Sequence, residues 1–338
     1  MNLHSVHDLS LAPRAVTLII HDKAVIIAFT HSGTKKGDNG NLGNQTEIAK
    51  SYDVLAERFV GWTRSRSDIR AALLIGSRVR NDRPADEWAD LDVVVITTNA
   101  EYYVLTEDWV REMGKPLLTL VEPTATGDEK ERRVLYEGML DVDFAILPLE
   151  KARQMLRGAE SSQTAAQLAN SLGRGVRVLI DKDNMLPDLK EIKPPSAKAS
   201  AEKPTEGEFL NVVNDFLYHT IWTAKHLLRG ELWWADLACN CRLSQLMLRM
   251  IEWHAQAEHD WKYDTWFRGR FLEEWADQQI LEELKTTFTH YDKQDTSKTL
   301  MATLNMFHRI AKETADKQGY HYPQEAFKSI REWLQTRL

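Results

Sequence analysis

The feature that most constrains the fold of this chain is a small turn followed by two carboxylates at the start of an apolar run. Gly76 and Ser77 form the turn, and Asp90 and Asp92 open the run 93–96. Residues two apart on a strand face the same side, so the two aspartates project together while the leucine between them enters the core. Two carboxylates this close repel each other unless a cation lies between them. The segment therefore predicts a cation site at the end of a buried strand.

A third carboxylate, Asp143, lies within the apolar stretch 140–147 and faces the same site from a neighbouring strand. Asp141 shares its face but lies nearer the turn. Magnesium prefers hard oxygen ligands and often shares them with phosphate oxygens. Three carboxylates can hold two magnesium ions about 3.5–4 Å apart. We therefore expect Asp90, Asp92 and Asp143 to bind metal and to be catalytic.

The turn before the carboxylates is suited to binding the phosphates of a nucleotide. Gly76 has no Cβ, so its backbone can come close to a phosphate. Ser77 offers a hydroxyl and a backbone N–H, and a helix beginning there would add a favourable dipole. Arg78 and Arg80 would neutralise the tail of a triphosphate. Glu122, at the end of a later strand, is a second candidate for the general base beside the third aspartate.

Hydrophobic periodicity predicts a mixed β-sheet with helices on one side in the first half of the chain. Thr106 is expected to cap the second helix. The expected helices are 47–64, 106–113 and 150–172. The expected strands are 71–75, 91–97, 116–121, 132–136, 142–147 and 176–180, with the fourth and fifth forming a hairpin.

The second half has apolar residues at three- and four-residue steps and predicts a helical bundle. Residues 187–207 are rich in Pro, Lys and Glu and are expected to be a linker. The fold class is thus α+β, with a sheet domain over 46–186 and a helical, substrate-binding domain over 208–338. Residues 1–45 are expected to be a disordered appendage, either an upstream extension or an added segment.

The composition narrows the classes of partner. The net charge of −7 and the pI near 5.9 argue against nucleic acid and suit a cationic small molecule. No run reaches the roughly 18 apolar residues of a membrane span. The two cysteines, Cys239 and Cys241, would point apart on a helix, so no disulfide is expected. We expect a cytoplasmic monomer.

These residues resemble the nucleotidyltransferase superfamily related to DNA polymerase β, and most closely its aminoglycoside 6-adenylyltransferase branch, which modifies streptomycin. The resemblance covers about residues 46–325. In the first half it is carried by residues 74–78, 88–94 and 142–144, and in the helical half by 222–231 and 250–254.

The resemblance implies ATP as co-substrate, two magnesium ions, and transfer of AMP to the 6-hydroxyl of a streptomycin-like aminoglycoside with release of pyrophosphate, a reaction of antibiotic resistance. Lys225 would reach the triphosphate from the second domain. Four residues would offer rings and carboxylates to a cationic acceptor: Trp233, Trp234, Asp236 and Glu252.

Two other hypotheses stay open beside this one. The same mechanism would serve a lincosamide, another metabolite or a protein hydroxyl as acceptor. A nucleotide-binding protein without catalysis is disfavoured by the intact set of carboxylates. The chain also departs from the branch at residues 262–270, where Arg268 and Arg270 take the place of lysines, so the geometry of phosphate binding would differ there.

Overall fold

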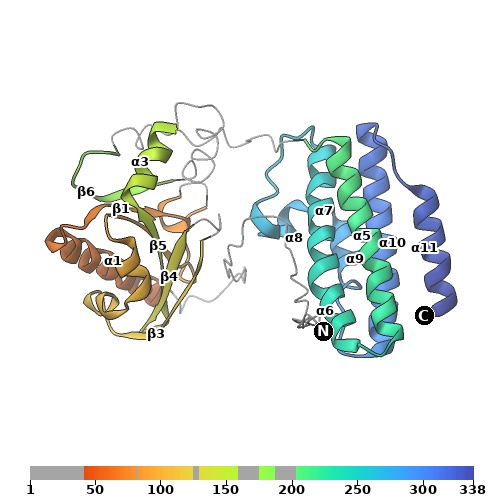
Figure 1. Ribbon diagram of the computed structural model, residues 1–338, viewed down its shortest axis with the longest axis horizontal. Helices are drawn as coiled ribbons and strands as arrows, with labels where there is room; N and C mark the ends of the chain where they lie inside the picture. Colours follow the sequence, from red (N-terminus) through yellow and green to blue (C-terminus); the bar gives the residue numbers. More distant parts are fainter. Residues whose placement is uncertain (1–41, 81–82, 125–128, 159–174, 187–202) are drawn as a thin grey trace, which may run out of the picture. The chain divides into compact units, whose positions relative to one another are not determined.

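The computed structural model describes residues 42–80, 83–124, 129–158, 175–186 and 203–338 (Figure 1). They form two compact units, one with the sheet and one with the helical bundle. Most of the expected appendage and of the expected linker lies outside the described residues, so both stay predictions. The first helix, α1 (Leu42–Ser65), begins inside the segment expected to be disordered.

The first unit contains a six-stranded mixed sheet in the order β3-β4-β5-β2-β1-β6. Strands β2 and β5 pair in parallel, and the other neighbouring pairs are antiparallel. The mixed sheet and the β4–β5 hairpin are therefore confirmed. The strands are β1 (Ile69–Ile75), β2 (Leu91–Thr97), β3 (Pro116–Pro123), β4 (Lys130–Tyr136), β5 (Leu140–Pro148) and β6 (Arg177–Asp181).

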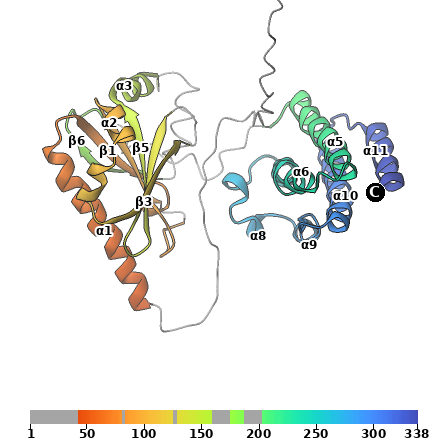
Figure 2. The same cartoon turned by 60° about the horizontal axis from the view of Figure 1, so that its bottom comes forward.

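Helices cover both faces of this sheet, so the prediction of helices on one side is wrong. On one face, α1 and α2 (Ala100–Leu105) contribute to a core that includes Ala72 and Leu74 of β1. On the other face, α3 (Leu149–Gly158) packs with Ala71 and Leu73 (Figure 2). The reason is that β1 is apolar at every step from residue 71 to residue 75, and such a strand must be covered on both sides.

The prediction of a helix over 106–113 is also wrong. Helix α2 ends before it, and the Thr106 hydroxyl donates to the Tyr102 carbonyl at 2.8 Å, which closes α2 instead of starting a new helix. A short 3₁₀ helix, η2 (Asp108–Glu112), follows. Trp109 is buried and its indole N–H donates to the Thr106 carbonyl at 3.1 Å, which folds the segment into the core. Helix α3 ends at Gly158, and the expected continuation to 172 lies outside the described residues.

The second unit is a helical bundle, as predicted (Figures 1 and 2). Helix α5 begins with a capping box in which Thr205 and Glu208 satisfy each other's backbone N–H groups. The long helices α5, α7 and α10 pack around stacked Phe216 and Phe307 rings. The elements are α5 (Glu206–Leu228), α6 (Leu232–Leu237), the π-helix η4 (Ala238–Leu243), α7 (Ser244–Glu258), η5 (Phe267–Gly269), α8 (Leu272–Trp275), α9 (Gln278–Leu284), α10 (Lys293–Gln318) and α11 (Gln324–Arg337).

Two predictions from the whole sequence concern disulfides and membrane spans. Cys239 is buried and Cys241 is exposed, and both are free thiols, as their spacing predicts. In the part of the chain that the structure describes, no helix combines the length and apolar character needed to cross a bilayer.

Candidate active site

The three predicted metal ligands converge at one end of the sheet. The parallel pairing of β2 with β5 places Asp92 beside Asp143. Asp90 comes directly before β2. One carboxylate oxygen from each residue lies within 4.8 Å of those of the other two. A cluster of three carboxylates at this spacing has the oxygen donors that magnesium prefers.

The Gly76 turn packs directly against this cluster. Residue 75, the last residue of β1, pairs with Asp92 on β2. The turn that begins at Gly76 therefore lies beside the Asp92 carboxylate. Gly76 has a φ of +78°, and a Cβ built there would lie 2.9 Å from the Cγ of Asp92. Glycine is required at this position both for its backbone angle and for space. The turn opens a 3₁₀ helix of only three residues, η1 (Ser77–Val79), so the expected helix dipole is small.

The Ser77 hydroxyl is the feature of the turn that points most directly to a ligand. It is buried, and no hydrogen-bond partner for it lies within the described residues. Buried polar groups are nearly always satisfied, so an unsatisfied hydroxyl next to a carboxylate cluster calls for a bound group. A phosphate oxygen is a suitable acceptor for this hydroxyl.

Arg78 has contacts within the protein that the sequence did not suggest. Its Nε donates to the Asp90 carbonyl at 2.9 Å, and an Nη donates to the Ala89 carbonyl. Its guanidinium lies 3.6 Å from the ring centroid of Tyr52, whose hydroxyl donates to Asp141 at 2.7 Å. These contacts fix the backbone that carries Asp90 into β2. A role of Arg78 in phosphate binding stays a prediction.

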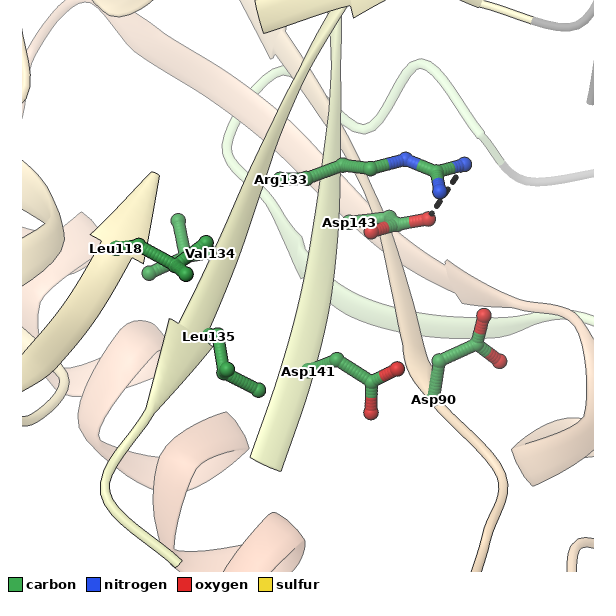
Figure 3. Close-up of a pocket in the computed structure, with 7 residues that line it drawn as sticks. All are labelled: Asp90, Leu118, Arg133, Val134, Leu135, Asp141 and Asp143. Atoms are coloured by element: carbon green, nitrogen blue, oxygen red, sulfur yellow. Dashed lines mark ion pairs between the residues drawn. The ribbon is translucent and has the colours of Figure 1, made fainter. Parts of the chain in front are cut away.

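Arg133 is a site residue that the sequence reasoning missed. It lies opposite Asp143 on the neighbouring strand β4, and its Nη2 is 3.2 Å from Asp143 Oδ2 (Figure 3). Its Nε is 2.6 Å from Glu122, the alternative candidate for the general base, and its Nη2 is 3.0 Å from Glu131. The signal was present in the predicted hairpin, because counting outward from a turn at Gly138 places Arg133 opposite Asp143.

Two carboxylates of the cluster, Asp92 and Asp143, hold their protons more tightly than isolated ones do. Burial raises the pKa of Asp143 to about 7, with Asp90 and Glu131 adding to the effect and Arg133 opposing it. Burial, together with the charges of Asp90 and Asp143, raises the pKa of Asp92 well above its usual value. Such shifts are expected where like charges share a site, and a bound cation would reverse them.

A pocket of about 150 Å³ opens beside Asp143. Figure 3 shows that Asp141 and Asp143 on β5 and Arg133 on β4 line the same space, with Asp90 next to them and leucines on the opposite wall. The pocket thus combines an acidic wall with an apolar one. Its lining residues are Asp90, Leu118, Arg133, Val134, Leu135, Asp141 and Asp143.

The candidate residues of the second unit lie on three helices, α5, α6 and α7. Lys225 is exposed on α5. Trp233 and Trp234 are both exposed on α6, but they diverge: Trp234 contacts the Trp222 ring, and Trp233 contacts the Tyr291 ring.

The two acidic candidates of the second unit are less accessible than the tryptophans. Asp236 accepts a hydrogen bond from Asn240 at one oxygen, and its other oxygen is buried without a partner among the described residues. Glu252 lies on α7, where burial raises its pKa to about 7. In residues 262–270, where the chain departs from the branch, Trp266 and Arg268 have φ of +53° and +54°, a strained backbone for residues with a Cβ and of the kind found at ligand sites.

The chain is similar to known proteins along most of its length. A family model described as "Streptomycin adenylyltransferase" matches residues 49–337. An aminoglycoside 6-adenylyltransferase of Bacillus subtilis (strain 168) is 23% identical over 280 residues, covering 81% of this chain and 93% of the relative. One of Staphylococcus aureus is 24% identical over 260 residues, covering 76% and 88%. A crystal structure of an aminoglycoside 6-adenyltransferase from Bacillus subtilis, 20% identical, covers 84% of this chain and 96% of that chain with a TM-score of 0.38.

Proposed function

The chain belongs to the streptomycin adenylyltransferase family, and from that premise we propose that it transfers AMP from ATP to a hydroxyl of an aminoglycoside. As a member of this family it is a nucleotidyltransferase. The proposed acceptor is streptomycin-like and modified at its 6-position, with release of pyrophosphate. The observation that carries the proposal is the convergence of Asp90, Asp92 and Asp143 beside the unsatisfied Ser77 hydroxyl.

Asp90, Asp92 and Asp143 would hold two magnesium ions. Their fit to the metal is supported by the close spacing of hard oxygen donors. When bound, the ions supply positive charge that steadies the triphosphate and favours the ionised form of the attacking hydroxyl. The turn at Gly76 and Ser77 would hold phosphate oxygens.

Asp143 is the better of the two candidates for the general base. Glu122 is paired with the Nε of Arg133 at 2.6 Å, whereas Asp143 both belongs to the carboxylate cluster and lines the pocket. A base must lie within hydrogen-bond reach of the proton that it removes. An acceptor hydroxyl placed in the pocket would meet Asp143, and its attack on the α-phosphorus would be governed mainly by positioning.

The acceptor is expected to be a cationic small molecule. The pocket beside Asp143 has an acidic wall, and the chain as a whole has a net charge of −7. In the second unit, the exposed rings of Trp233 and Trp234 would stack on guanidinium or ammonium groups, with Asp236 and Glu252 as counter-charges. The unsatisfied oxygen of Asp236 supports its part in this set.

The decisive experiment measures pyrophosphate release from ATP and magnesium with purified full-length protein. Parallel reactions contain streptomycin, other aminoglycosides, a lincosamide or no acceptor, and the product is weighed by mass spectrometry. Release that requires streptomycin, with a mass gain of one AMP on the drug, is the expected result. Release that requires only the lincosamide would replace the proposed acceptor, and silence with every acceptor would contradict the proposal.

Variants connect the activity to the site. Asp90→Ala and Asp143→Ala should abolish transfer while the protein remains folded by circular dichroism. Asp53→Asn removes an exposed carboxylate on α1 and should leave turnover unchanged. Glu122→Gln separates the two candidate bases, since it should retain measurable turnover where Asp143→Asn does not. Near-normal turnover in Asp143→Ala would remove the assignment.

A further inference from the structure

A positively charged side chain is built into the carboxylate cluster. Arg133 lies opposite Asp143 in the β4–β5 pairing, and its Nη2 is 3.2 Å from Asp143 Oδ2 (Figure 3). The same guanidinium also forms ion pairs with Glu122, at 2.6 Å from its Nε, and with Glu131, at 3.0 Å from its Nη2. The side chains of Arg133, Asp143 and Glu131 are 19%, 13% and 12% exposed, so their charges are weakly screened by solvent.

This arrangement constrains Asp143 in two ways. One of its oxygens, Oδ2, is bonded to the guanidinium, which restricts the direction in which the carboxylate points. The guanidinium also brings positive charge to carboxylates that repel one another. Since the planar fork of arginine has a fixed geometry, it orients its partner carboxylate as well as neutralising it.

We propose that Arg133 is a positioning residue, which fixes the orientation of Asp143 for the metal ions and supplies part of their charge before they bind. This rests on the proposed magnesium site. Removing the charge should then make the carboxylates attract a divalent ion more strongly, while Asp143 loses its anchor. Metal affinity and turnover should therefore move in opposite directions, which a purely structural arginine would not cause.

The test compares Arg133→Gln and Arg133→Lys with wild type in the full chain. Mn²⁺ binding is measured by the electron paramagnetic resonance signal of the free ion, and thermal unfolding is followed with and without Mn²⁺. Arg133→Gln should bind Mn²⁺ about tenfold more tightly. Its Tm should be lower without metal and should rise more on adding Mn²⁺ than that of wild type.

Turnover provides the second half of the signature. With saturating metal, kcat of Arg133→Gln should fall at least about tenfold, because Asp143 is no longer oriented. Arg133→Lys keeps the charge but not the fork, so its Mn²⁺ affinity should stay within about twofold of wild type while kcat recovers in part.

A matched control is available at the other end of β1. Arg66 forms an ion pair with Asp68 at 3.2 Å, and both side chains are partly buried. The pair lies beside residue 97, at the end of β1 opposite to Gly76. Arg66→Gln should lower the Tm equally with and without Mn²⁺ and leave Mn²⁺ affinity unchanged.

The outcomes separate this inference from the proposed function. Wild type that binds no Mn²⁺ would overturn the metal site and the role of Arg133 together. Wild type that binds Mn²⁺, with Arg133→Gln binding it equally or more weakly, would overturn only the role of Arg133. If Arg133→Gln does not fold, Glu122→Gln decides. This substitution removes a carboxylate that pairs with Arg133, so more of the Arg133 charge acts on the carboxylate cluster. Mn²⁺ binding should then weaken about two- to threefold. Unchanged or tighter binding would overturn the inference.

Discussion

Gly76 and Asp92 occupy adjoining space: a Cβ on the glycine would lie 2.9 Å from the Cγ of the aspartate. Gly76 directly follows β1 and Asp92 lies on β2, and the pairing of residue 75 with Asp92 brings them together. The turn at Gly76 and the Asp92 carboxylate are therefore fixed against each other. A change in one must move the other.

The first prediction concerns Gly76→Ala. The new methyl group meets Asp92 and the φ of +78° is unfavourable for alanine, so we expect a loss of about 1–3 kcal/mol in the free energy of unfolding. We expect a fall of roughly a hundredfold in kcat, because small displacements at a reacting centre cost that much. Urea unfolding and steady-state kinetics measure the two effects.

The matched control for this variant is Gly61→Ala in α1. No atom lies within 4 Å of a Cβ built there, and the residue is helical. Alanine should stabilise the helix by up to about 1 kcal/mol and leave kcat unchanged. Wild-type turnover in Gly76→Ala would show that the turn and Asp92 are not coupled.

The second prediction concerns Ser77→Ala. The hydroxyl is buried without a partner among the described residues, so its removal should leave the free energy of unfolding unchanged or raise it slightly. If the hydroxyl binds a phosphate oxygen, KM for ATP should rise about five- to thirtyfold, since about 1–2 kcal/mol of binding is lost. Ser65→Ala, which removes a hydroxyl bonded to the Trp62 carbonyl at 2.8 Å, should leave KM unchanged. A destabilised Ser77→Ala with normal KM would contradict the assignment.

The convergence of the three carboxylates was predictable because it depends on local patterns. The apolar run after Asp92 fixes a buried strand, the run around Asp143 fixes another, and the two-residue period sets the facing side. Gly76 was predictable as a turn for the same reason. The parallel pairing of the two strands then brings the carboxylates to one end of the sheet.

The missed features depend on contacts between distant segments. Arg133 and Arg132 are neighbours of the same charge, yet Arg132 faces the core and donates to the carbonyl of Tyr103, while Arg133 faces the carboxylates. The register of the hairpin determines which of the two arginines faces the core and which faces the carboxylates. Arg78 was expected at the phosphates, but Tyr52, from a helix earlier in the chain, offers its ring to the guanidinium. Composition and periodicity carry no information on the contact between Arg78 and Tyr52, whereas counting outward from the hairpin turn at Gly138 does identify the pairing of Arg133 with Asp143.

The third prediction concerns pH. Burial raises the pKa of Asp143 from 3.8 to about 7. The folded protein therefore binds a proton more tightly than the unfolded chain, and this contribution to stability is full below about pH 4 and lost as the pH rises through 7. The loss is on the order of 4 kcal/mol for a shift of about three units. Magnesium should offset it, because the metal binds the ionised carboxylates.

Urea unfolding at about pH 5 and about pH 8, in EDTA and in magnesium, measures this effect. We expect the metal-free protein to be less stable at the higher pH and the gain from magnesium to be larger there. Asp143→Asn should show a smaller pH dependence in EDTA. An equal pH dependence in wild type and Asp143→Asn would contradict the assignment of the titrating group.

The fourth prediction decides what Arg78 does. The structure shows its guanidinium bonded to the carbonyls of Asp90 and Ala89 and lying over the Tyr52 ring, whereas the sequence suggested phosphate binding. If Arg78 holds the backbone of Asp90, Arg78→Met should lower the free energy of unfolding by about 1–3 kcal/mol and lower kcat, with KM for ATP nearly unchanged. If it also binds phosphate, KM should rise about tenfold or more. Tyr52→Leu removes the ring contact, the two hydrogen bonds between Tyr52 and Asp141, and part of the packing of a buried side chain. Tyr52→Leu should therefore lower the free energy of unfolding, as Arg78→Met does. It should leave KM for ATP as in wild type in either case, so a rise in KM that occurs only in Arg78→Met would be due to the guanidinium itself.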